Sequence, residues 1–85
     1  EATHLNDDDY QLVEPEGDFL EATTKWFNVE KGYGFVTSGE DTPDIFIHIK
    51  ALRRLGVDHL LPGQNLRIRV GTGPKGPQVA DVELL

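Results

Sequence analysis

The sequence predicts a small all-β protein, a five-stranded antiparallel barrel preceded by a flexible acidic segment. Three observations carry this prediction. Short runs of β-branched and aromatic residues alternate with turn formers, no stretch supports a substantial helix, and the charge divides the chain in two. The 85 residues include no cysteine, which excludes a disulfide framework, a zinc ribbon and a thiol nucleophile.

The N-terminal quarter of the chain differs from the rest in charge. Residues 1–21 hold eight acidic residues and no Lys or Arg, a charge of −8. Residues 22–85 hold the other seven acids and all eight Lys and Arg, a charge of +1. Such a block is typical of a solvated tail, so we predict a disordered acidic tail or linker over 1–21 and a folded domain over 22–85. In the alternative, Tyr10, Leu12 and Val13 dock loosely on the domain.

Strand-like segments follow one another with turn signals between them. The turns EKG, SGEDTPD and GTGPKGP are rich in Gly, Pro, Asp and Ser. The stretch KALRRLG is too short for a long helix and predicts a single helical turn. The five predicted strands are residues 22–30, 33–38, 44–49, 64–71 and 78–85.

Alternation along the predicted strands separates two faces. Aliphatic side chains share the inner face, where they can fill a small barrel: Val36, Ile45, Ile47, Leu66, Ile68, Val70, Ala80, Val82 and Leu84. Aromatic rings remain for the outer face: Phe27, Tyr33, Phe35 and Phe46. Exposed rings in one contiguous patch mark an interaction site more often than chance.

Cations accompany the predicted outer rings. Lys25 alternates with Phe27, and Lys31 lies in the first turn. Unpaired bases stack on rings while cations neutralise phosphate, so this composition favours single-stranded nucleic acid. Gly32 and Gly34 would let a base approach without a Cβ in the way. In the alternative, some rings belong to the core and the sheet is ordinary.

Four stretches of residues 24–85, KWFN, KGYGFV, DIFIHI and GPKGPQVADV, resemble the bacterial cold-shock domain in order and spacing. KGYGFV is similar to the first ribonucleoprotein motif of that family and DIFIHI to the second. The resemblance implies an OB-fold barrel that binds single-stranded RNA and DNA, with no enzymatic activity. We expect no cofactor and no metal. The binding residues it implies are Lys25, Trp26, Phe27, Lys31, Tyr33, Phe35, Asp44, Phe46, His48 and Lys75.

The resemblance also implies roles, and two positions depart from it. The family's rings stack on bases, its lysines meet phosphate, and the counterpart of Asp44 can hydrogen-bond a base edge. Ile49 and Val57 stand where the family usually has aromatics. Arg53 and Arg54 either offset this loss or are solvated charges.

The cellular context follows as a set of expectations. We expect a cytoplasmic monomer that acts as an RNA chaperone or as a regulator of transcription or translation in a stress response, with no membrane segment. The initial Glu1 and the acidic lead suggest the C-terminal part of a protein with a second cold-shock domain in the same chain. A metal role for His48 lacks partners, because His4 and His59 do not fall at ligand spacing. The alternative function is a protein-interaction module on a degenerate cold-shock fold.

Overall fold

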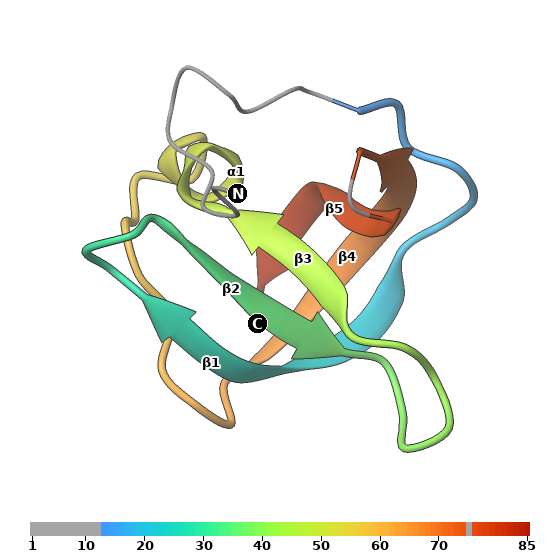
Figure 1. Ribbon diagram of the computed structural model, residues 1–85, viewed down its shortest axis with the longest axis horizontal. Helices are drawn as coiled ribbons and strands as arrows, with labels where there is room; N and C mark the ends of the chain where they lie inside the picture. Colours follow the sequence, from blue (N-terminus) through green and yellow to red (C-terminus); the bar gives the residue numbers. More distant parts are fainter. Residues whose placement is uncertain (1–12, 75) are drawn as a thin grey trace.

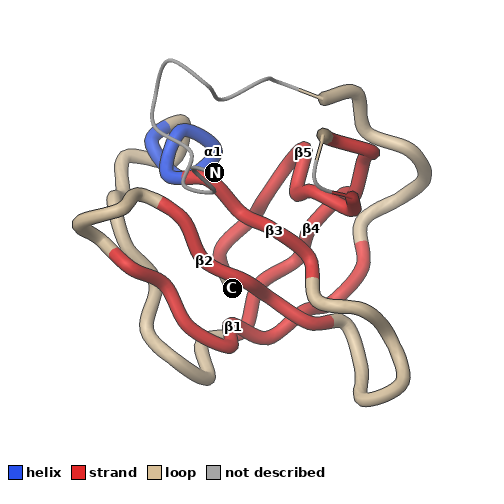
Figure 2. Tube along the Cα trace, in the orientation of Figure 1, coloured by secondary structure: helices blue, strands red, loops and turns tan. Residues whose placement is uncertain are grey.

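The computed structural model describes residues 13–74 and 76–85, and its regular secondary structure is almost all β-strand (Figure 1). One short helix lies against one end of the barrel, where the third strand ends (Figure 2). No helix in the described ranges is long and apolar enough to cross a membrane. The elements are β1 (Leu20–Asn28), β2 (Tyr33–Thr37), β3 (Ile45–His48), α1 (Ile49–Arg53), β4 (Asn65–Gly73) and β5 (Gly76–Leu84).

The strands close into a barrel in the order β1-β2-β3-β5-β4, which confirms the predicted five-stranded OB-fold. β1 pairs with both β2 and β4, β2 with β3, and β4 with β5, all antiparallel. The closing pair, β3 with β5, is parallel and places Phe46 opposite Gln78. The predicted antiparallel arrangement therefore describes every pairing except the one that closes the barrel.

Aliphatic side chains from all five strands fill the interior. Most of the predicted inner residues lie in the core: Val36, Ile45, Ile47, Leu66, Ile68 and Val82. β5 departs from the predicted alternation, because Arg69 faces Asp81 whereas the next residue, Val70, faces Val79. This bulge turns Val79 into the core. Leu84, predicted to be internal, is 37% exposed at the end of the strand.

The predicted helical turn is confirmed as α1. His48 caps its N-terminus, with its Nδ1 accepting a hydrogen bond from the Lys50 backbone N–H at 3.1 Å. A helix this short has no stability of its own, because nucleation is costly. Ala51 and Leu52 are buried in the core cluster, so packing against the barrel holds the turn in place.

Residues 13–19 pack against β4, and we call this segment the strap. β1 begins at Leu20, two residues before the predicted start of the domain, and its pairing with β4 ends at Ile68. Beyond Ile68 the strap, instead of β1, lies along β4. There the Glu16 N–H donates a hydrogen bond to the Val70 carbonyl at 2.7 Å. Covering this edge satisfies backbone groups that would otherwise be open to other chains.

The strap is also held by side chains on the outer face of β4. The Phe19 ring lies 5.5 Å from the guanidinium carbon of Arg67 and 5.7 Å from that of Arg69. Arg69 Nε donates to the Gly17 carbonyl at 3.1 Å. Residues 1–12 of the predicted tail lie outside the described residues.

Candidate nucleic-acid interface

Five rings form a continuous chain over β1, β2 and β3, and we call them the ring surface: Trp26, Tyr33, Phe35, Phe46 and His48. Trp26 lies 5.4 Å from Phe35 and 6.0 Å from Tyr33, measured between ring centroids. Phe46 lies 5.7 Å from Tyr33, 5.9 Å from Phe35 and 6.3 Å from His48. These separations and tilted orientations are those that aromatic pairs prefer.

Strand register creates this arrangement. Phe35 stands directly opposite Phe46, and Tyr33 directly opposite His48, in the antiparallel pair of β2 and β3. Side chains that stand directly opposite each other on one face of a sheet come within contact distance. Because side chains alternate between the two faces, the next pair on the same face lies two residues further along each strand. The motifs YGFV and IFIH therefore place four rings on one face.

A β-bulge in β1 decides which of the two adjacent rings, Trp26 or Phe27, faces outward. The register shifts between Thr24 and Trp26, and Trp26 comes to lie opposite Phe35. Phe27 then lies opposite Gly34 and packs against the core cluster. The predicted outward direction of Phe27 is corrected: its ring is half-buried and packs against the core, because simple alternation does not anticipate the extra residue of a bulge.

Gly34 is required by the packing inside the barrel. A Cβ at this position would lie 2.7 Å from the Phe27 Cα and 2.8 Å from its Cδ1, and would collide with the Trp26 carbonyl. The missing side chain therefore makes room for β1 and its inward ring. This corrects the expectation that Gly34 opens the surface to a base.

Exposure differs sharply among the five rings. Trp26 is 43% exposed, and Tyr33 and Phe35 are half-buried. Phe46 is 4% exposed and His48 is 1% exposed, contrary to the prediction of an exposed Phe46. Phe46 sits in the middle of the chain of rings, in contact with rings on both sides. The accessible part of the ring surface therefore belongs to the rings of β1 and β2.

Two exposed lysines flank the accessible rings in the sequence, Lys25 beside Trp26 and Lys31 two residues before Tyr33. Lys25 Nζ lies 3.2 and 3.3 Å from the two carboxylate oxygens of Asp44, and about half of each side chain is exposed. Lys31 is exposed in the turn between β1 and β2, where its backbone N–H donates to Asn28 Oδ1 at 2.9 Å. Lys75 lies outside the described residues.

The two residues that depart from the family pattern both pack against the barrel. Ile49 is 6% exposed, and its N–H donates to the Gly32 carbonyl at 2.8 Å. Val57 packs against the core cluster. Arg54 pairs with Asp81 of β5 at 3.6 Å, so it is engaged inside the chain.

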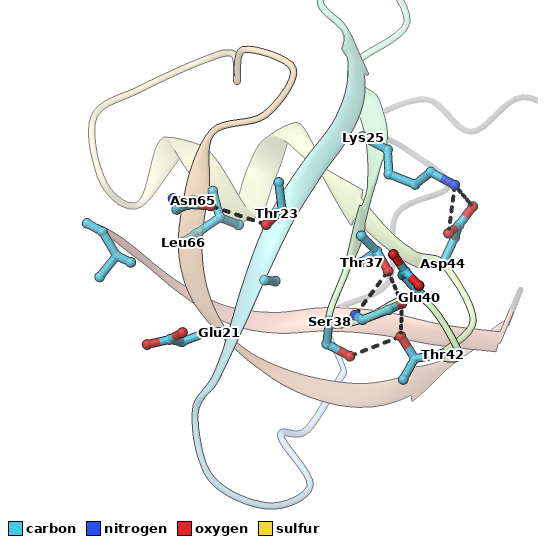
Figure 3. Close-up of a pocket in the computed structure, with 13 residues that line it drawn as sticks. Glu21, Thr23, Lys25, Thr37, Ser38, Glu40, Thr42, Asp44, Asn65 and Leu66 are labelled. Carbon is cyan, nitrogen blue, oxygen red and sulfur yellow. Dashed lines mark hydrogen bonds and ion pairs between the residues drawn. The ribbon is translucent and has the colours of Figure 1, made fainter.

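A groove of about 730 Å³ is lined by the Lys25–Asp44 pair (Figure 3). Its walls carry hydroxyl and amide groups, among them Thr23, which donates to Asn65 Oδ1 at 3.1 Å. The charged lining residues are one lysine and three acids: Lys25, Glu21, Glu40 and Asp44. This balance disfavours phosphate, which leaves the ring surface as the candidate interface.

Comparisons with known proteins agree with this geometry. A family model described as the "cold-shock" DNA-binding domain matches residues 20–85. Over 63 residues the chain is 36% identical to the cold shock-like protein CspC of Shigella flexneri and to the cold shock-like protein CspE of Escherichia coli K12. Each alignment covers 74% of this chain and 91% of the relative. With its closed five-stranded barrel and its chain of rings, the protein belongs to the cold-shock domain family, whose members bind nucleic acids.

Proposed function

We propose that the chain binds single-stranded RNA and DNA by stacking unpaired bases on the accessible rings of the ring surface. The observation that carries the proposal is the cross-strand chain of rings, of which Trp26, Tyr33 and Phe35 are reachable from solvent. A base can stack on any of them, since every base has a π face, and sequence specificity is accordingly low.

Charged groups beside the rings hold the strand. Lys31 and Lys25 neutralise phosphates, and Lys75 is predicted to add a third contact. The ion pair between Lys25 and Asp44 is exposed, so it contributes little and exchanges easily for ligand contacts. Once released, the Asp44 carboxylate can accept a hydrogen bond from the amino edge of a base.

The cellular role that fits this activity is non-enzymatic. Weakly specific stacking keeps RNA single-stranded, which is the work of an RNA chaperone or of a regulator of transcription or translation. Two relatives bear the name cold shock-like protein, which supports a role in a stress response. A monomer in the cytoplasm remains our prediction.

Titration of Trp26 fluorescence with a pyrimidine-rich oligonucleotide tests the proposal. We expect quenching, because a stacked base contacts the indole directly. Phe35→Ala should weaken binding by about 1–3 kcal/mol, the value of one base–aromatic stack. Phe35→Leu keeps an apolar side chain of similar size but no ring, so it should lose most of the same affinity.

Phe19→Ala is the matched control, because it removes a Phe ring that packs on β4 against Arg67 and Arg69, and it should not weaken binding. Unchanged affinity in both Phe35 variants would refute stacking on the ring surface. Absence of any oligonucleotide binding by the full chain would favour the alternative of a protein-interaction module.

A further inference from the structure

The strap leads the chain toward the ring surface. Its first residues contact Gly71, where any Cβ would collide with the Glu14 carbonyl and lie 2.9 Å from Val13 Cγ2. Gly71 stands opposite Gln78 of β5, and Gln78 stands opposite Phe46 of β3. Neighbouring strands lie about 4.8 Å apart, so two steps place Gly71 about 10 Å from Phe46 across the sheet.

Independent contacts hold the strap in this place. One is the backbone hydrogen bond from Glu16 to Val70 at 2.7 Å, and another is the bond from Arg69 to the Gly17 carbonyl at 3.1 Å. The Phe19 ring, in contact with two guanidinium groups, fixes the end next to β1. The strap therefore sets the point from which residues 1–12 continue.

Residues 1–12, the acidic segment, complement the ring surface in charge. Their acids are Glu1, Asp7, Asp8 and Asp9, and they contain no Lys or Arg. A flexible chain of this length spans roughly 5–6 Å times the square root of its length, or about 20 Å. Two further strand steps, from Phe46 to Phe35 and from Phe35 to Trp26, bring the distance across the sheet to about 19 Å, which this span matches. Lys25 and Lys31, which border the accessible rings, are both exposed.

We propose that the strap holds the acidic segment beside the ring surface, where its carboxylates compete with nucleic acid for the bordering lysines. This inference rests on the proposed function. Each carboxylate–lysine contact is weak and screened by salt. Tethering compensates, because short flexible linkers give effective concentrations in the millimolar range. The acidic segment therefore lowers the affinity for oligonucleotide a few-fold and does not block binding.

Charge-neutral variants of the full chain test the competition. Asp8→Asn with Asp9→Asn should tighten oligonucleotide binding about threefold at low salt, as expected for a tethered weak competitor. Asp41→Asn with Asp58→Asn removes the same charge from two exposed loops and should have a smaller effect. Between about 0.01 M and 0.15 M salt the Debye length falls from about 30 to 8 Å, so the difference between the two pairs should shrink.

Loosening the strap tests its directing role. Gly71→Ala places a methyl group against the Glu14 carbonyl, and Phe19→Ala removes the ring between the guanidinium groups. In either background, neutralising Asp8 and Asp9 should gain less than in the parent, as a double-mutant cycle would show. Circular dichroism confirms that each variant keeps its strands.

These experiments distinguish three claims: competition by the acidic segment, the directing role of the strap, and the proposed function itself. If the parent binds oligonucleotide and neutralising Asp8 and Asp9 changes nothing at low salt, competition by the acidic segment is refuted. If the gain is equal with intact and loosened straps, the directing role of the strap is refuted. If the parent does not bind oligonucleotide at all, the proposed function fails before this inference is reached.

Discussion

Two faces of the barrel combine rings with cations and use them differently. On β4, Arg67 and Arg69 hold the Phe19 ring between them. Their charges are balanced by Glu83 at 3.5 Å and Asp81 at 3.4 Å. On the ring surface the rings contact one another, and Lys31 has no acidic partner among the residues that the structure describes.

The difference shows that composition alone does not identify a binding face. Rings and cations stabilise the fold when the chain itself supplies both partners, as the strap does on β4. They become available to a ligand when neighbouring rings hold one another in place and the cations remain exposed. The ring surface meets this second condition on β1 and β2, where Trp26 is 43% exposed.

The largest expected effect is the difference in stability between variants of a buried ring and of an accessible ring. Phe46→Ala should lower the free energy of unfolding by about 3–5 kcal/mol, as for other buried Phe→Ala changes. Phe35→Ala should cost less, since its ring is half-buried. Urea denaturation followed by circular dichroism measures both. Equal costs would mean that Phe46 supports the ring surface no more than its neighbour does.

Restoring the family's aromatics sharpens the comparison. Sequence alone suggests that Ile49→Phe with Val57→Phe would add stacking surface. Because Ile49 is buried and Val57 packs on the core, we expect the pair to be overpacked and to lower stability by about 1–3 kcal/mol. Denaturant midpoints and oligonucleotide titrations test this, and a gain in affinity at unchanged stability would contradict it.

A smaller effect is expected on β4. Phe19→Ala should lower the free energy of unfolding by about 1 kcal/mol, because it removes two exposed cation–π contacts worth about 0.5–1 kcal/mol each. Hydrogen exchange at the Glu16 amide should accelerate as the strap loosens. An unchanged exchange rate would show that the backbone contacts hold the strap without the ring.

The smallest effect concerns salt. Three phosphate contacts from Lys25, Lys31 and Lys75 predict a log–log salt slope of about −2, from about −0.7 per contact on single strands. Lys31→Gln should reduce the slope by about 0.7, whereas Arg67→Gln should leave it unchanged because that arginine is paired on β4. A change with Arg67→Gln would extend the interface to the second face.

Local pattern was enough to predict the barrel, the inner aliphatic face and the turn that became α1. The alternating pattern gave the wrong faces at the two bulges. A bulge inserts one residue into a strand and reverses the faces that strict alternation assigns beyond it. Gly34 of β2 was the available signal for the bulge in β1, since a glycine opposite a ring leaves room for that ring inside. The strap was anticipated only in part: the alternative that Val13 docks on the domain agrees with its place beside Gly71, whereas Tyr10 and Leu12 lie outside the described residues. The contacts of Phe19 were not anticipated, because they depend on two arginines about 50 residues later. Phe19, an aromatic residue in an otherwise acidic stretch, was the available signal for these contacts.

The parallel pairing of β3 with β5 has a consequence for synthesis. β3 is complete at His48, but its partner Gln78 is made about 30 residues later, which takes roughly 2–6 s at the usual rates of translation. During that interval one edge of β3, including Phe46, lacks its strand on the emerging chain. The barrel therefore cannot close at this edge until β5 has been made, and the β3 edge of the ring surface is the last to gain its partner.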